Sequence, residues 1–189
     1  MRLIVVTLCL LLAGCANLSF HRVQYKPKGN LLVSIRKTEG SFTGSVKRDT
    51  GYFFYVETEP AGSDPTLTGY HIVDGDIKEE FGGSDSKEVL KAIAAVGLEP
   101  FDYQKEVQTV TARFEKEAQQ RGEQYIAPMA LDGAEYEIII VIDKGKLSLR
   151  EWNPGSTIDA YAAYSPKIAK LKKVLDILAQ YYGRFKFGV

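Results

Sequence analysis

The residues best suited to catalysis gather in one short segment of the chain. His71 is followed by Asp74 and Asp76, so a nucleophile–histidine–acid site would use His71 with one of these carboxylates as its orienting partner. Glu79 and Glu80 add further carboxylates, and paired acids can hydrolyse glycosides. The sequence contains no Gly-x-Ser-x-Gly turn to present a serine nucleophile. A hydrolase is therefore one hypothesis, and a solvent-facing histidine beside a turn rich in aspartate is the other.

A second pattern of catalytic type is the Ser-x-x-Lys pair formed by Ser84 and Lys87. Penicillin-binding proteins and serine β-lactamases combine this pair with Ser-Asp-Asn and Lys-Thr-Gly elements, and the sequence contains neither. The pair is better explained as the start of a helix, in which Asp85 and Glu88 resemble a capping box. We therefore assign no catalytic residue here.

The sequence predicts neither a metal site nor a cofactor. Its histidines are His21 and His71 and its cysteines are Cys9 and Cys15, which is too few for a dedicated zinc site. The acidic spacing around Asp74 fits no calcium loop. No glycine-rich phosphate loop of the Walker or Rossmann kind occurs, so we expect no nucleotide.

Several residues in the carboxyl-terminal part are of types that bind proteins. Trp152 lies at a predicted turn, and tryptophan is enriched at interface hot spots. Tyr161 and Tyr164 belong to an aromatic stretch, and any aromatic left exposed would suit a protein or glycan contact. Lys170 and Lys173 lie on the last predicted helix and could meet an acidic partner or anionic lipid headgroups. The competing interpretation is a solvated helix face with its aromatics in the core.

Three segments have the apolar spacing of helices. The first follows Asp85, and Gly97 and Pro100 are placed to end it. The second is expected over residues 102–121, although its β-branched residues leave a strand open at 107–111. The third begins with Ser165 as N-cap and Pro166 as first helical residue. The apolar stripes of the last two are Tyr103, Val107, Val110, Phe114 and Ala118, and Ile168, Leu171, Leu175, Leu178 and Tyr182.

The remaining periodicity is that of strands. Runs of β-branched and aromatic residues are separated by turn residues, which is typical of an antiparallel meander. They occupy residues 31–35, 42–47, 52–56, 70–73, 76–78, 136–142 and 147–150, with further short strands considered at 20–25 and 184–189. Residues 60–69 are expected to form an exposed loop, and Asp74-Gly75 a tight hairpin turn. The apolar run at 138–142 predicts a central strand buried on both faces. Together these elements predict an α+β domain, with about six antiparallel strands and about three helices on one face.

The amino terminus has the parts of an export signal. Arg2 is followed by an almost unbroken apolar run over residues 3–12, which is too short to span a membrane. The run ends in Leu12-Ala13-Gly14-Cys15, which resembles the lipobox of bacterial lipoproteins. The resemblance implies that residues 1–14 are removed and that Cys15 carries diacylglycerol on its sulfur. It also implies residence in the outer membrane, because Ala16 stands where an Asp is associated with retention in the inner membrane.

This anchor and the composition define the expected function. We expect residues 15–29 to form a lipidated tether and residues 30–189 a single domain. The chain has 24 basic and 24 acidic residues, so nothing in its overall charge favours binding to nucleic acid. We expect a periplasm-facing binding module of the cell envelope, with an assembly or inhibitor role toward an envelope protein. The alternative is a cell-envelope hydrolase that uses His71 and nearby carboxylates.

Overall fold

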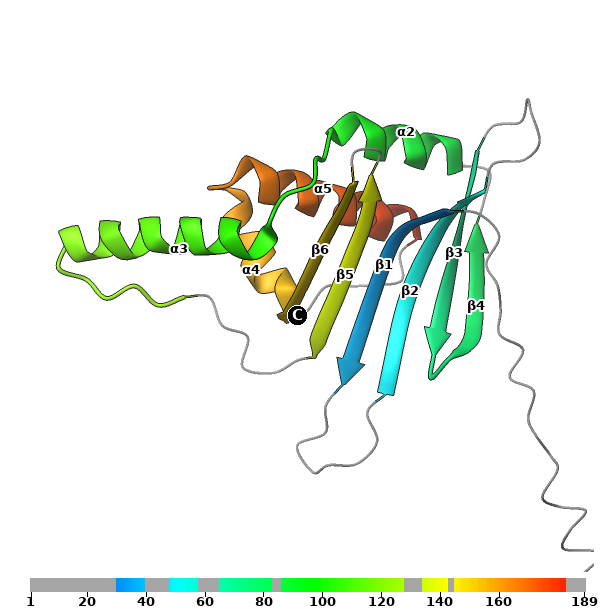
Figure 1. Cartoon of the computed structure of the whole chain (residues 1–189), viewed down its shortest axis with the longest axis horizontal. Helices are drawn as coiled ribbons and strands as arrows, with labels where there is room; N and C mark the ends of the chain where they lie inside the picture. Colours follow the sequence, from blue (N-terminus) through cyan, green and yellow to red (C-terminus); the bar gives the residue numbers. More distant parts are fainter. Residues whose placement is uncertain are drawn as a thin grey trace, which may run out of the picture.

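The computed structural model contains an antiparallel sheet of six strands with helices packed on one of its faces (Figure 1). It describes residues 30–39, 48–57, 65–82, 86–127, 134–142 and 145–182. The strands are β1 (Asn30–Glu39), β2 (Arg48–Glu57), β3 (Thr66–Val73), β4 (Asp76–Gly82), β5 (Glu135–Ile142) and β6 (Gly145–Trp152). The helices are α2 (Ser86–Val96), α3 (Tyr103–Gln120), α4 (Pro154–Ala162) and α5 (Pro166–Tyr182). The predicted α+β class and strand number are confirmed, and the described residues hold one helix more than expected.

The strand order is β4-β3-β2-β1-β5-β6, and every neighbouring pair is antiparallel. The first four strands form a meander, and after α2 and α3 the chain returns beside β1, where Val33 is paired with Ile140. The predicted Asp74-Gly75 turn joins β3 to β4, with φ of 51° and 86° at its two residues. These positive φ values are those that a two-residue hairpin turn requires.

The core lies between the sheet and the helices α2, α4 and α5. Val33, Ile138 and Leu147 face it from three adjacent strands, and all three are fully buried. The predicted stripe of α5 packs against them through Ile168, Leu171, Leu175 and Leu178. Burying these aliphatic side chains removes apolar surface from water, which stabilises the fold by roughly 25 cal/mol for each Å² of apolar surface buried.

The expectation that residues 138–142 are buried on both faces is wrong. Ile138 and Ile140 are fully buried, whereas Ile139 between them is half-buried and Val141 is 38% exposed. The reason is that the described helices cover only one face of the sheet (Figure 1). Alternate residues of β5 therefore face away from the helices. We call the opposite face the helix-free face.

The predicted helix boundaries are largely confirmed. Asp102 caps α3, because its Oδ1 accepts a hydrogen bond of 3.0 Å from the Lys105 amide, and the alternative of a strand at 107–111 is wrong. Ser165 caps α5 in the same way, accepting from the Ile168 amide at 3.2 Å. Gly97 ends α2 and Gly122 follows α3, with φ of 60° and 71°. Both values are left-handed, where glycine has no steric penalty.

Two expectations need correction. Residues 66–69, expected in a loop, belong to β3, because they pair with β2 as far as Thr66 with Glu57. The turn expected around Trp152 instead opens helix α4, with Asn153 as its N-cap. The predictions for residues 20–25, 42–47 and 184–189 lie outside the described residues, as do those for Ser84 and Asp85. Among the described residues no helix combines the length and the apolar character needed to cross a membrane.

Candidate binding surfaces

His71 lies in β3 with its ring stacked on Tyr52, at 4.7 Å between ring centroids and 8° between planes. Its Nε2 is buried and has no hydrogen-bond partner among the described residues. Burial lowers the pKa of this imidazole, which favours its neutral form. Asp76, one of the two acids considered as its partner, forms an ion pair with Lys78 at 3.5 Å, and Asp74 lies in the hairpin turn. These surroundings do not favour a His71-based hydrolase.

The other chemistry-bearing patterns are likewise used structurally or lie outside the described residues. Ser84 of the Ser-x-x-Lys pair falls in the undescribed segment 83–85. Ser86 is buried, and its hydroxyl donates to the Leu67 carbonyl at 3.2 Å, which ties the start of α2 to β3. Within the described ranges no three His, Cys, Asp or Glu residues are grouped to hold a metal ion.

The lysines of α5 are largely engaged within the domain. Lys167 donates to Glu106 at 2.9 Å and Lys170 to the Gly97 carbonyl at 2.9 Å. Lys172 bonds to Asp176 at 2.8 Å, which raises the pKa of its ammonium group. Lys173 is exposed on the same helix. Because three of these four cations have intramolecular acceptors, the helix is a weaker anion-binding surface than its sequence indicates.

The two tyrosines proposed as contact residues differ in their surroundings. Tyr161 is 2% exposed, and its hydroxyl lies 2.9 Å from Thr111 Oγ1 and 2.8 Å from the Tyr125 hydroxyl. Tyr161 therefore helps to connect α4 to α3, and its side chain is not exposed for contact with a partner. Tyr164 is 50% exposed and packs edge-on against Phe114, at 4.5 Å between centroids. The exposed tyrosine thus lies in the helix layer, away from the helix-free face of the sheet.

Strand alternation places Trp152 on the helix-free face, because Leu147, Leu149 and Glu151 of β6 face the helices. The tryptophan is 48% exposed and lies opposite Glu135 of β5. Arg150 reaches diagonally across to the same Glu135 through two hydrogen bonds of 2.8 Å. A row of charged side chains crosses the neighbouring strands. Arg150 is paired with Glu137 of β5, and Glu137 is paired with Arg36 of β1, whose guanidinium nitrogen lies 3.9 Å from the Glu137 carboxylate. We call Arg36, Glu135, Glu137, Arg150 and Trp152 the Trp152 face.

The residues on both sides of Trp152 are anchored to the domain. Glu151 accepts hydrogen bonds of 2.7 Å from the Tyr103 hydroxyl and from Thr157 Oγ1. Burial, and then this bond to Glu151, raises the pKa of Tyr103, so the phenol stays a donor. On the other side Asn153 forms two hydrogen bonds with Ala134. Its backbone N–H donates to the Ala134 carbonyl at 3.0 Å, and its side-chain oxygen accepts from the Ala134 N–H at 3.1 Å. The backbone that presents Trp152 is therefore fixed.

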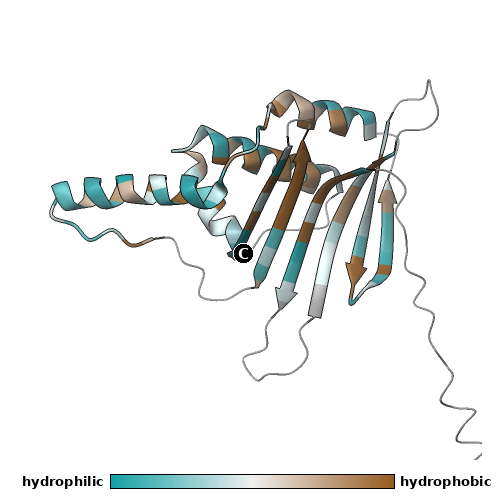
Figure 2. Cartoon of the chain, viewed as in Figure 1, coloured by the Kyte–Doolittle hydropathy of each residue, from teal (hydrophilic) through white to brown (hydrophobic). Residues whose placement is uncertain are grey.

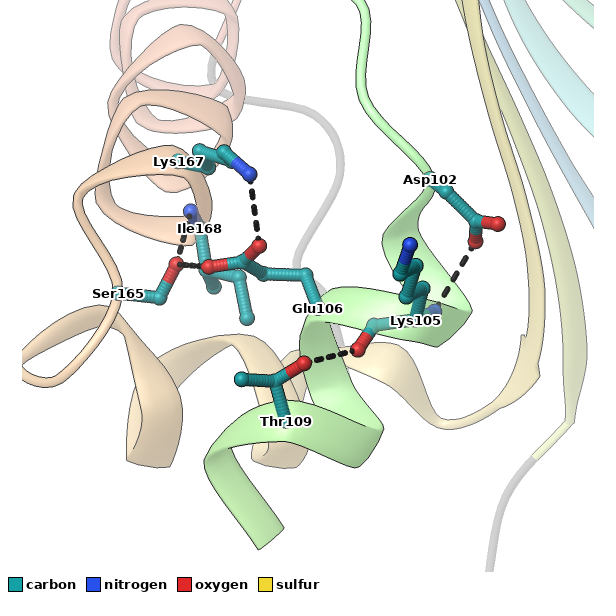
Figure 3. Close-up of polar contacts among 7 residues, drawn as sticks. All are labelled: Asp102, Lys105, Glu106, Thr109, Ser165, Lys167 and Ile168. Atoms are coloured by element: carbon teal, nitrogen blue, oxygen red, sulfur yellow. Dashed lines mark hydrogen bonds and ion pairs between the residues drawn. The ribbon is translucent and has the colours of Figure 1, made fainter. Parts of the chain in front are cut away.

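Helix α3 is joined to α5 by a small polar network, which Figure 3 shows. Glu106 accepts from the Ser165 hydroxyl at 2.7 Å and from Lys167 Nζ at 2.9 Å. These bonds lower the pKa of Glu106. Ser165 thus links two helices, because the same oxygen that caps α5 also donates to α3. The network, together with Tyr103, positions α3 against the end of β6.

An apolar groove of about 370 Å³ lies where α2, α5 and the ends of β1 and β5 meet. Its lining includes Leu90 and Ala94 of α2, Leu32 of β1, Ile142 of β5 and Val174 of α5. Among the described residues that line it, Glu99 is the one ionisable residue. The end of β5 nearest α2 is correspondingly apolar (Figure 2). No sequence pattern indicated this groove, because its walls come from four elements far apart along the chain.

Comparisons with known proteins give no relative for this chain. No protein family matches it, and no curated protein and no solved structure resembles it significantly.

Proposed function

We propose that this protein is a lipid-anchored, periplasm-facing binding module of the bacterial cell envelope. It holds an envelope protein on the Trp152 face, in an assembly or inhibitor role. The observation that carries the proposal is the half-exposed Trp152 between two anchored neighbours and beside Arg150. Tryptophan and arginine are the residue types most enriched at interface hot spots, and a fixed backbone lowers the entropy lost on binding.

Charge supports the same surface as a protein-binding site. Arg36, Glu137 and Arg150 alternate in sign across three strands, and their side chains are 49%, 41% and 69% exposed. Exposed pairs of this kind add little to the stability of the fold. At an interface they set orientation and exclude partners with the wrong charge pattern. A partner with a complementary row of charges around an apolar pocket for the indole would fit this face.

The anchor supports the location of the domain. The lipobox at Leu12-Ala13-Gly14-Cys15 is the basis for placing acyl chains on Cys15, in the outer membrane. Two or more chains hold a protein on a bilayer essentially permanently. Fourteen residues separate Cys15 from Asn30, so the domain stays within roughly 50 Å of its lipid even if that segment is fully extended. Partners in the same membrane then meet it at high effective concentration.

The test is affinity capture of envelope proteins by the lipidated full chain, quantified by mass spectrometry. Trp152→Ala should reduce recovery of the principal partner by about 30-fold, the loss typical of a hot-spot residue. Tyr181→Ala is the matched control, because Tyr181 is an aromatic of similar exposure (41%) on α5, and it should leave recovery unchanged. Equal recovery with Trp152→Ala, or equal loss with both variants, would refute the assignment of this face.

A further inference from the structure

We infer that the groove between α2, α5 and β5 is a binding site for one hydrocarbon chain of a single-chain lipid, a fatty acid or a lysophospholipid. This site is separate from the Trp152 face, and the inference stands whether or not that face binds a protein. A volume of about 370 Å³ lies at the small end of the roughly 300–1,000 Å³ range of ligand pockets. That size suits one chain rather than a lipid with two.

The lining determines what kind of ligand can be buried. Apart from Glu99, the described side chains that line the groove are aliphatic, and no aromatic ring is among them. In the part of the chain that the structure describes, a sugar, a heterocycle or a peptide backbone buried here would meet no polar side chain other than Glu99, and each of its polar groups left unpaired would cost several kcal/mol. A hydrocarbon chain has no polar atoms to satisfy. The groove therefore favours an apolar segment over a polar one.

The charges near the groove suit a lipid whose polar head stays in water. Glu99 lines the groove, and the ammonium group of Lys170 bonds to the carbonyl of Gly97, another lining residue. Among the described residues, one negative and one positive group therefore lie close to the chain site, and neither sign dominates there. Lipids with a carboxylate head and lipids with a zwitterionic head are both acceptable. The proposed tether adds a source for such chains, because it keeps the domain near a bilayer.

Isothermal titration with fatty acids tests the site directly. The protein is the whole mature chain, residues 15–189, with Cys15→Ser so that it carries no acyl chain of its own. Decanoic, dodecanoic and tetradecanoic acids are titrated below the concentrations at which they aggregate. Affinity should rise roughly fourfold for each added methylene until the groove is full, and then level off. A lysophospholipid with a dodecanoyl chain is titrated in parallel.

Two substitutions on α2 provide the matched comparison. Ala94 is exposed and lines the groove, so Ala94→Trp should fill it and weaken binding about tenfold or more. Ala95, the next residue, is also exposed and is not among the residues that line the groove, so Ala95→Trp should bind as the parent does. Circular dichroism of each variant confirms that it is folded.

Each outcome decides the question. Binding of the fatty acids assigns a fatty acid as ligand, and binding of the lysophospholipid alone assigns a membrane lipid. Binding of neither, affinity independent of chain length, or equal loss with Ala94→Trp and Ala95→Trp would overturn the inference. None of these results depends on Trp152, so failure here is distinguishable from failure of the protein-binding face.

Discussion

We predict that the substitution Gly69→Ala in β3 destabilises the protein when Phe81 is present and stabilises it when Phe81 is replaced by alanine. A Cβ added to Gly69 would lie 2.6 Å from Phe81 Cδ2 and 2.8 Å from Cζ, well inside the roughly 3.5–4.0 Å of a favourable carbon contact. Phe81 cannot simply turn away, because its ring packs against Phe54 and Tyr182, at 5.7 and 5.2 Å between centroids. Gly69→Ala should therefore cost about 1–3 kcal/mol, as overpacking of a core does.

In a Phe81→Ala background the clash is gone. Gly69 has an ordinary strand conformation, and alanine in a strand is more stable than glycine by roughly 0.5–1 kcal/mol. Gly69→Ala should then stabilise the protein, which gives a coupling of about 1.5–4 kcal/mol between the two sites. Urea unfolding of the parent, both single variants and the double variant measures it, provided that the slope with urea is constant. The same cost for Gly69→Ala in both backgrounds would refute the packing argument.

Two further predictions concern the α3 joint and the anchor. Glu106→Ala should lower the free energy of unfolding by about 1–2 kcal/mol at pH 7, because it removes the bonds to Ser165 and Lys167. Since the folded-state pKa of Glu106 lies below its ordinary value of 4.5, this contribution is complete above pH 4.5. It is lost as the pH falls through the folded-state pKa, so a pH series of unfolding curves in which the difference between parent and variant does not shrink in acid would contradict it. At the amino terminus, mass spectrometry of the mature protein should find a diacylglyceryl group on Cys15, and Cys15→Ser should release the domain from washed membranes. An unmodified thiol would exclude the anchor.

Local patterns in the sequence predict the strands and the long helices well. The Asp74-Gly75 turn, the cap at Ser165 and the stripe from Ile168 to Leu178 each depend on neighbours within one or two turns of chain. Helix α4 is different. It opens with Pro154-Gly155 after a left-handed Asn153, which has the sequence of a turn, and its nine residues are too few for a repeating apolar stripe. Its position depends on Asn153 bonding to Ala134, nineteen residues away.

The candidate binding residues show more clearly what local sequence patterns leave undetermined. The residue type of Trp152 predicts a contact residue, but its exposure follows from strand alternation and from the absence of a described helix on that face. The residue type of Tyr161 predicts the same role, yet Tyr161 is buried in a hydroxyl cluster with Thr111 and Tyr125. Residue type alone does not separate these two cases. The partners of Tyr161 lie 36 and 50 residues away in sequence, beyond the reach of any local pattern.

The arrangement of the two proposed sites predicts that they act independently. Trp152 lies on the helix-free face at the end of β6, whereas Ala94 lies on α2 beside the opposite end of β5, near Ile142. The effects of substitutions at distant sites that share no partner generally add within about 0.5 kcal/mol. Trp152→Ala should therefore leave titration with dodecanoic acid unchanged, and Ala94→Trp should leave capture of the protein partner unchanged. If saturating lipid altered capture by more than about twofold, the two sites would be coupled. The sheet between them would then have to differ between the lipid-bound and lipid-free states.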